Sequence, residues 1–310
     1  MTLDSFLQNF LNAMQLGSYL ALIAVGYTMV YGVLLLINFA HGDIFMVGAY
    51  VGYFIGTFLL NRFDVQLPFD LPSWVVIPVT VILTMAITAL VGVTLERVAY
   101  RPLRNRGAHR LYLVITALSA GLFLEYINLA SLGARDRQFP ELIKKQIYPL
   151  GGVSVTNIQI MVILVSFSVM GLLWFIVQRT RWGMAMRAIS YDRLAVPLMG
   201  VSVDKVIVTT FVIGSSMAAL AGVMYGTAYP ILRFDMGLLV GWRAFIAAVV
   251  GGIGSIRGAM LGGYLMGFTQ IFVTAFLPST FRDLITFTVF LLILSVRPTG
   301  LFGVARRTKV

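Results

Sequence analysis

Apolar runs of roughly 20 residues recur along this chain, and short polar segments separate them. A run of that length forms a helix that crosses about 30 Å of hydrocarbon, because a helix pairs its own backbone polar groups. Hydrophobic residues make up 59% of the 310 residues and charged residues 11%, which is typical of a polytopic membrane protein. No polar segment is long enough to fold separately, so residues 1–310 are predicted to form one integral-membrane domain.

The predicted fold class is an all-α polytopic membrane protein with about eight to nine transmembrane helices, some of them broken or re-entrant. The polar segment INFAHGD (37–43) could dip back into the membrane, and a short run could fail to cross it, so the side of the N-terminus stays open. The apolar runs cover about residues 14–36, 44–60, 75–95, 111–131, 158–177, 206–229, 238–253, 258–277 and 284–296.

The basic residues predict an orientation. Fifteen of the 23 lysines and arginines lie in residues 96–110, residues 179–205, the turn at 254–258 and the C-terminal tail. Because lysine and arginine are enriched on the cytoplasmic side of membrane proteins, these segments are predicted to be cytoplasmic. The net charge of +11 therefore reflects topology and does not indicate nucleic-acid binding.

Small residues recur every four positions in two of the runs. Such spacing lets helix backbones approach closely, and glycine has no other advantage inside a span. Both stripes are therefore predicted to face neighbouring helices. They consist of Gly48, Gly52 and Gly56 in one run and of Gly214, Ala218, Gly222 and Gly226 in the other.

The stretch FIAAVVGGIGSIRGAMLGGYLMG (245–267) combines strong hydrophobicity with seven glycines. Its centre, GSIRG, interrupts the apolar sequence, and irregular backbone at membrane depth must be shielded from lipid. Two interpretations stay open at this point. The segment is either a tight hairpin between two packed spans or a broken helix that lines a functional site.

Several classes of chemistry are excluded. The chain has no cysteine and two histidines, so disulfides, thiolate catalysis and an all-histidine metal site are absent. It also lacks a GxxxxGK[ST] phosphate loop and the HExxH and GxSxG motifs of hydrolases. We therefore expect neither an enzyme nor a cofactor-binding or metal-binding protein.

Three ionisable residues fall in or beside apolar runs, where such groups often mark transport sites. For His41 and Asp43 the sequence favours a structural role, in which Asp43 caps the helix that begins near Ile44. For Glu125 a buried hydrogen bond or ion pair and a role in transport are equally compatible with the sequence.

Residues 179–205 form the longest polar segment, and they contain a helix-like run, 184–195, that Pro197 closes. One interpretation is an orientation loop or a helix that lies on lipid headgroups. The other is a docking element for a cytoplasmic partner. The pattern alone is compatible with both.

Four segments together carry a family resemblance. They are GYTMVYGVLLLINFAHGDIFMVGAY, ERVAYRPLR, RAISYDRLAVPLMGV followed by TFVIGSSMAALAGV, and AFIAAVVGGIGSIRGAMLGG. They resemble the LivH-type permeases of branched-chain amino acid ABC importers, and INFAHG combined with AAVVGGIGSIxG is specific to that group. The resemblance spans nearly the whole chain. Arg257 departs from it, since these permeases usually have proline there, and Glu125 is an acid where an uncharged polar residue would be less costly.

This resemblance implies a type II ABC importer permease in the bacterial inner membrane. It implies four kinds of partner: a second, LivM-like permease, two cytoplasmic ATP-binding subunits, a periplasmic substrate-binding protein and membrane lipid. The expected cargo is a branched-chain amino acid. Related permeases that carry urea or short amides, and a self-sufficient ion-coupled transporter, are the alternatives. By the same resemblance, the ATPase-coupling residues are Gly183, Ala185, Arg187, Ala188, Asp192, Ala195 and Gly200.

A translocation pathway is predicted where INFAHGD and the glycine-rich stretch 245–267 interrupt the apolar sequence. We expect the two segments to meet near the middle of the protein, because discontinuous helices commonly mark the substrate route of transporters. Polar side chains would bind a zwitterion weakly, and glycines would leave room for its aliphatic group. The predicted pathway residues are Asn38, Ala40, His41, Gly42, Asp43, Gly251, Gly252, Gly254, Ser255 and Gly258.

Overall fold

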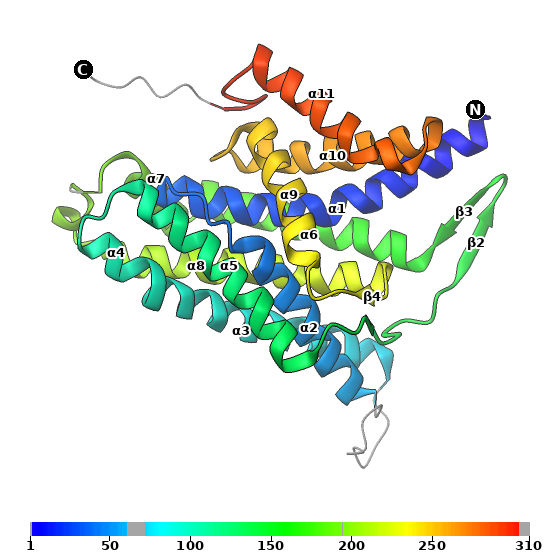
Figure 1. Ribbon diagram of the computed structural model, residues 1–310, viewed down its shortest axis with the longest axis horizontal. Helices are drawn as coiled ribbons and strands as arrows, with labels where there is room; N and C mark the ends of the chain where they lie inside the picture. The colour runs from blue at the N-terminus through cyan, green and yellow to red at the C-terminus, as the bar shows by residue number, and fades with distance from the viewer. Residues whose placement is uncertain (1, 61–71, 194, 304–310) are drawn as a thin grey trace.

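The computed structural model describes residues 2–60, 72–193 and 195–303, and Figure 1 shows that they form a bundle of helices. The longer helices are α1 (Leu3–Leu34), α2 (His41–Leu59), α3 (Ser73–Leu95), α5 (Arg110–Leu132), α6 (Asn157–Arg179), α8 (Val203–Ala228), α9 (Met236–Gly252), α10 (Ile256–Phe276) and α11 (Arg282–Val296). Shorter helical segments are the π-helical η1 (Glu96–Tyr100), α4 (Arg101–Asn105), α7 (Arg181–Tyr191), η2 (Val196–Met199) and η3 (Ser279–Phe281).

Four short strands lie outside the bundle. The antiparallel pair β2 (Ile147–Leu150) and β3 (Val153–Thr156) forms a hairpin between α5 and α6. The two-residue strands β1 (Arg137–Gln138) and β4 (Ile231–Leu232) also pair antiparallel. These strands tie loops together at one end of the bundle and contribute little to its core.

Within the described residues, eight helices are long and apolar enough to cross a membrane, and α9 is a shorter apolar helix. This confirms the all-α polytopic fold with about eight to nine spans. One boundary differs clearly from the prediction, because α1 begins at Leu3 and not near residue 14. Its polar first turns are helical because Thr2 caps them and because Phe6 and Phe10 pack on Phe272 and Phe268 of α10.

Helices α1 and α8 form the centre of the bundle, and most of their residues are buried. The most extensive packing is between α1 and α10, and α8 packs on α1, α2 and α3. By contrast, α3, α5, α6 and α11 expose large apolar side chains along their outer faces. Those faces are suited to lipid or to further subunits.

The small-residue stripes face neighbouring helices, as predicted. A Cβ at Gly52 would lie 2.8 Å from Cγ2 of Val223, and one at Gly222 would lie 2.6 Å from the backbone nitrogen of Ala49. The stripe of α2 also meets the loop after α5, since a Cβ at Gly56 would lie 2.8 Å from Cδ2 of Leu142. Side chains at these positions would push the helices apart.

The glycine-rich stretch forms a tight hairpin of α9 and α10. Gly251 and Gly258 face each other too closely for either to carry a Cβ. Ser255 caps α10, because its Oγ accepts a hydrogen bond from the Gly258 amide at 3.2 Å. The amides of Leu301 and Phe302 bond to the carbonyls of Val250 and Gly251 at 2.8 and 2.9 Å, so the chain beyond α11 covers the turn. Of the two interpretations, the backbone adopts the hairpin.

The basic segments gather at one end of the bundle. Figure 1 places α4 and α7 together there, and an Arg104 to Asp204 ion pair joins the first two basic segments. Residues 304–310, which hold Arg306, Arg307 and Lys309 of the tail, lie outside the described residues. This arrangement is what a positive-inside protein requires.

Candidate functional site

The chain is not helical between α1 and α2, at residues 35–40. Leu35 has a left-handed backbone with φ of 55°, and its amide bonds to the Tyr31 carbonyl at 2.8 Å, which ends α1. Asn38 is almost fully buried, and its Oδ1 accepts a hydrogen bond from the Tyr100 hydroxyl at 2.6 Å. The irregular backbone is therefore shielded inside the protein, as its membrane depth requires.

His41 occupies a notch in α1. A Cβ at Gly26 would lie 2.6 Å from Cε1 of His41, and the imidazole packs edge-on against Tyr27 with ring centroids 4.7 Å apart. Within the part of the chain that is described, Nε2 of His41 has no hydrogen-bond partner. Residues 35–40, which we call the return loop, thus bring the start of α2 back alongside the middle of α1.

The prediction that Asp43 caps α2 is wrong. The helix begins at His41, and Ala40 holds the N-cap position without a side-chain hydrogen bond. Asp43 lies in the first turn instead, and its carboxylate fits between two glycines of other helices. A Cβ at Gly237 of α9 would lie 2.5 Å from Oδ1, and one at Gly121 of α5 would lie 2.5 Å from Oδ2.

Asp43 shares its surroundings with other acids. Glu125, one helical turn after Gly121 on α5, is close enough for its charge to act on Asp43, and Asp235 acts in turn on Glu125. We call Asp43, Glu125 and Asp235 the acidic cluster. The sequence analysis missed Asp235, although its place directly before the apolar helix α9 was a signal.

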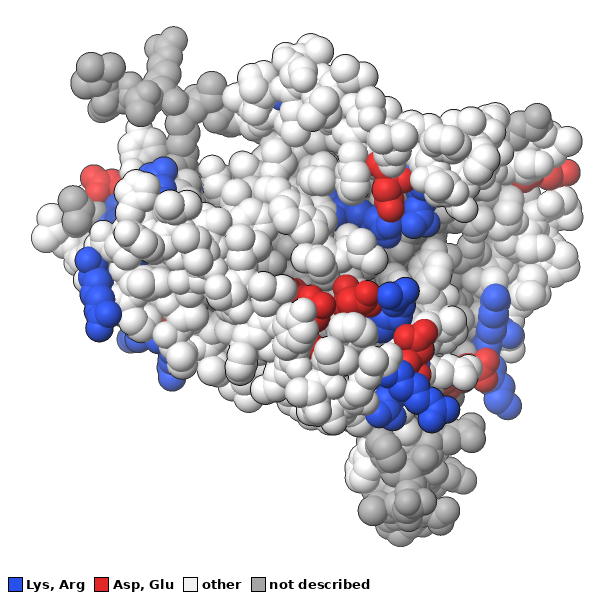
Figure 2. Space-filling model, viewed as in Figure 1, with Lys and Arg blue, Asp and Glu red and all other residues white. Residues whose placement is uncertain are grey.

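One member of this cluster pairs with a basic side chain, and a second ion pair joins α9 to α11. Arg233 forms an ion pair with Asp235 at 2.8 Å, and Arg243 forms one with Asp283 at 2.8 Å. On the face drawn in Figure 2, acidic and basic side chains gather around a hollow in a surface that is otherwise largely uncharged. Charged groups at membrane depth typically face a partner or a water-filled cavity, so this face is a candidate translocation surface.

INFAHGD meets the stretch 245–267 at the start of that stretch, where the ring centroids of Phe39 and Phe245 lie 5.3 Å apart, and not at its glycine-rich turn. Gly42 contacts the first half of α9, since a Cβ there would lie 2.5 Å from the carbonyl oxygen of Gly237 and 2.7 Å from Cα of Gly241. The turn lies at the other end of α9, where a Cβ at Gly254 would lie 3.8 Å from the Tyr31 ring. The helix from Gly241 to the turn is about 16 Å long. The return loop causes this separation, because it carries His41 back beside Gly26.

Most predicted pathway residues are buried in the single chain. Gly254 is exposed and Ser255 is half-buried. The accessible part of α9 consists of Leu238, Leu239 and Trp242, and Trp242 packs near Phe39 with ring centroids 5.6 Å apart. The buried residues are Asn38, Ala40, His41, Gly42, Asp43, Gly251, Gly252 and Gly258.

Residues 179–205 contain the helix α7, which begins and ends earlier than the predicted run 184–195. Thr180 starts it by accepting a hydrogen bond from the Gly183 amide at 3.2 Å, and Asp192 ends it with an extended backbone. Arg187 donates to the carbonyl of Val177 and thereby helps to cap α6. The segment thus contains two helical elements, α7 and η2.

The same segment is attached to the end of α1. Arg193 donates hydrogen bonds to the carbonyls of Val33, at 3.0 Å, and of Leu34. These carbonyls are free at a helix C-terminus, where a cation is favourable. Burial and the nearby charges of Arg104 and Arg110 lower the pKa of Arg193 from its ordinary value. A displacement of residues 179–205 would therefore act directly on α1.

An ion-pair network that was not predicted from the sequence joins three helical elements. Glu96 is fully buried, and Arg104 donates to its Oε1 at 2.9 Å and to Oδ1 of Asp204 at 2.7 Å. Arg101 lies 3.5 Å from Glu96 and 3.8 Å from Asp204. The network joins η1 and α4 to the start of α8. Its one sequence signal was an acid, Glu96, directly after an apolar run.

Comparisons with known proteins identify the family. Residues 9–294 match the family model described as "Branched-chain amino acid transport system / permease component". The chain belongs to this permease family.

Three relatives illustrate the range of sequence identity. The permease is 40% identical to the high-affinity branched-chain amino acid transport system permease protein LivH of Salmonella typhimurium, over 96% of each chain. It is 37% identical to BraD of Pseudomonas aeruginosa, a protein of the same description, over 96% of each chain. A probable LivH of Methanocaldococcus jannaschii is 26% identical over 93% of this chain and 90% of its own. No solved structure matches the chain.

The predicted coupling residues of this permease differ in exposure. Gly183 is buried against the end of α6, and Ala185 is half-buried beside α8. The others are exposed, namely Arg187, Ala188, Asp192, Ala195 and Gly200. Three large side chains in the same segment, which were not predicted as coupling residues, are also highly exposed. They are Tyr191 at 91%, Leu198 at 89% and Met199 at 81%.

Arg257, where the permease departs from the family pattern, has a partner. Its guanidinium lies 4.8 Å from the ring centroid of Trp174 on α6, which is a cation–π contact. A proline at this position could not make it. The contact joins α10 to α6 at the same end of the bundle as the coupling segment.

Proposed function

We propose that this permease is the membrane-spanning subunit of an ATP-driven importer of branched-chain amino acids in the bacterial inner membrane. The observation that carries the proposal is 40% identity, over 96% of both chains, to a protein named for high-affinity branched-chain amino acid transport. The chain has no phosphate loop, so ATP hydrolysis belongs to partner subunits.

The proposed assembly contains a second, LivM-like permease, two cytoplasmic ATP-binding subunits and a periplasmic substrate-binding protein. The exposed apolar faces of the outer helices support further subunits, although lipid also suits them. Residues 179–205 are proposed to contact an ATP-binding subunit. Tyr191, Leu198 and Met199 support this role, because large exposed apolar side chains at a bundle end often mark protein interfaces.

The proposed pathway runs along the hollowed face that the second permease would complete. The acidic cluster can attract the ammonium group of an amino acid, while Leu238, Leu239 and Trp242 offer apolar contact to its side chain. The broken segment with Asn38, Ala40, His41, Gly42 and Asp43 stays a proposed part of this pathway. Gly251, Gly252, Gly254, Ser255 and Gly258 are proposed to act at its cytoplasmic end.

Coupling requires two arrangements that ATP-bound and ATP-free partners prefer differently. The attachment of Arg193 to Val33 and Leu34 supplies a physical link, because a shift of residues 179–205 pulls on the end of α1. The return loop and the start of α2 follow directly after that end. The proposed motion therefore reaches the break between α1 and α2 through the end of α1.

Reconstitution tests the proposal. Proteoliposomes that hold the full complex should transport leucine, isoleucine or valine only under two conditions. ATP must be present on the side of the ATP-binding subunits, and the binding protein must be present on the opposite side. Vesicles with this permease alone should not transport. Uptake by the single chain, abolished by an ionophore, would favour the ion-coupled alternative, and ATP-driven uptake of urea or short amides but not of leucine would correct the cargo.

A further inference from the structure

Two cavities adjoin each other at the basic end of the bundle. One, of about 170 Å³, lies between α7 and the start of α8, and the other, of about 450 Å³, lies between the start of α8 and η1. They share Trp182 and Lys205. The smaller cavity is lined by Arg181, Trp182, Ala185, Val201, Ser202, Lys205 and Val206. The larger one is lined by Arg97, Arg101, Trp182, Asp204, Lys205, Val208 and Thr209.

This pair of cavities, which we call the basic groove, has an excess of positive charge. Its only acid is Asp204, and that carboxylate already pairs with Arg104 at 2.7 Å. Arg97, Arg181 and Lys205 form no ion pair among the described residues. Three cations from three separate elements therefore border one groove without an ion-pair partner among the described residues.

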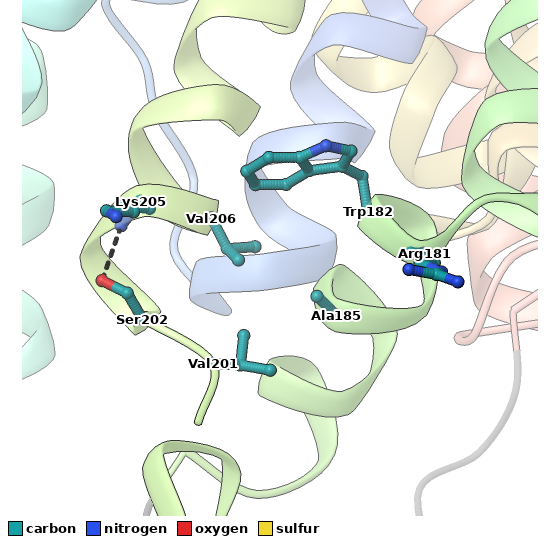
Figure 3. A pocket seen from close by; sticks show the side chains of 7 residues that line it. All are labelled: Arg181, Trp182, Ala185, Val201, Ser202, Lys205 and Val206. Atoms are coloured by element: carbon teal, nitrogen blue, oxygen red, sulfur yellow. Dashed lines mark hydrogen bonds between the residues drawn. The ribbon is translucent and has the colours of Figure 1, made fainter. Parts of the chain in front are cut away.

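An aromatic side chain lies between the cations. Trp182 is half-exposed, and Figure 3 shows its indole over the smaller cavity, with Lys205 to one side and Arg181 to the other. Tryptophan is enriched at membrane–water interfaces, where its ring lies at the level of the headgroups. The basic end of the bundle is the place for such an interface.

An apolar surface leads away from the groove into the membrane. On the outer face of α3 and η1, Leu90 is 67% exposed and Val98 is 72% exposed. Leu90 precedes Arg97 by seven residues, or two helical turns, so the two side chains lie on the same face. A ligand bound at Arg97 could therefore lay a hydrocarbon chain along this face.

We propose that the basic groove binds the phosphate headgroup of an anionic phospholipid. Guanidinium and ammonium groups are the usual phosphate ligands of proteins, and basic pockets between transmembrane helices on the cytoplasmic side bind anionic headgroups. A free phosphate would leave Leu90 and Val98 uncovered, whereas a lipid covers them with its acyl chains. The ligand class is thus a lipid and not a soluble anion.

The groove borders the surface proposed for the ATP-binding subunit, since Ala185, a predicted coupling residue, lines it. Met184, Ala188 and Tyr191 follow one another at spacings of four and three residues and form the exposed face of α7. Arg181 and Ala185 lie on the flank of α7 that is turned towards α8. Tyr191, Leu198 and Met199, the large exposed side chains proposed to contact the ATP-binding subunit, do not line the groove.

Lipid nanodiscs test this inference with the assembled complex. Brominated phosphatidylglycerol, diluted into phosphatidylcholine, should quench the fluorescence of Trp182, and Trp182→Phe should remove that quenched component. The double variant Arg181→Gln, Lys205→Gln should need at least a five-fold higher fraction of phosphatidylglycerol for half-maximal quenching. Arg106→Gln, a charge change at the same bundle end but outside the groove, should behave like the parent protein.

Four outcomes would overturn the inference. Equal quenching by brominated phosphatidylcholine would show that the headgroup charge does not matter. An equal loss in Arg106→Gln would indicate general surface electrostatics and no defined site. Competition by millimolar inorganic phosphate at constant ionic strength would assign the groove to a soluble anion. If the double variant loses its ATP-binding subunits but keeps the parent's lipid dependence, the groove is a protein interface and not a lipid site.

Discussion

Gly48 of α2 lies directly against Ala219 of α8, so that a Cβ at position 48 would lie 2.6 Å from the Cα of Ala219. Gly222 of α8 is equally close to α2, because a Cβ at position 222 would lie 2.6 Å from the backbone nitrogen of Ala49. The two helix backbones therefore touch. The position of Asp43 in the acidic cluster depends on this packing, because Asp43 lies on the same helix, just over one turn before Gly48.

Leucine at Gly222 should reduce the folded yield. The larger side chain forces α2 away from α8, and overpacking of this kind typically costs about 1–3 kcal/mol, occasionally more. Gly171→Leu is the matched control, because a Cβ there meets nothing within 4 Å. The measurement is the monodisperse fraction in size-exclusion chromatography together with the thermal midpoint. Equal behaviour of the two variants would contradict the packing argument.

Arg104→Gln should destabilise the permease. It leaves the fully buried Glu96 with only the weaker Arg101 contact at 3.5 Å, and removal of one partner of a buried ion pair typically costs about 3–5 kcal/mol. Adding Glu96→Gln should restore much of the loss, since no unpaired charge then remains. A double-mutant cycle on thermal midpoints measures this coupling. Additive losses would show that the network contributes nothing as a unit.

Met199→Asp should lower co-purification with the ATP-binding subunits and leave membrane insertion intact. The side chain is 81% exposed, so the substitution buries no charge within the permease. Ile147→Asp, at the exposed β2 strand of the other end, is the control. Charge reversal at Asp192 should act in the same direction as Met199→Asp. Normal assembly and normal stimulated ATP hydrolysis in both variants would remove residues 179–205 from the interface.

Arg187→Glu should behave differently from Met199→Asp. Arg187 donates to the carbonyl of Val177, so its reversal loosens α7 from α6 in addition to changing the surface charge. We expect a lower thermal midpoint as well as weaker assembly. Arg179→Glu, an exposed residue at the end of α6, is a control for charge alone. An unchanged midpoint for Arg187→Glu would show that the bond to Val177 is not needed.

Single cysteines can map the proposed pathway, because the chain has none of its own. Leu239→Cys, on the accessible part of α9, should react with a water-soluble thiol reagent at a rate that nucleotide changes. Leu291→Cys on the exposed face of α11 should stay unreactive. We expect cysteines at Asn38, Gly252 and Ser255 to react only when the complex changes its conformation. Asn38 and Gly252 are buried and Ser255 is half-buried in this structure. Inertness at all four pathway positions in transporting complexes would place the pathway elsewhere.

The sequence by itself determined the class of fold, most of the spans and the small-residue stripes. Each depends on local features, namely the length of an apolar run or a four-residue spacing within one helix. It also predicted that INFAHGD and GSIRG interrupt helices. The family followed from motifs that stand intact in the sequence.

Only the tertiary structure decided which apolar helices are central and where the interruptions lie relative to each other. Apolar runs that face lipid and apolar runs that face protein have similar composition, because lipid tails are as apolar as leucine. Glu96, Arg104 and Asp204 meet across about 100 residues of sequence, and Asp43 is enclosed by glycines of α5 and α9. No local pattern encodes such contacts, since they depend on how distant helices pack.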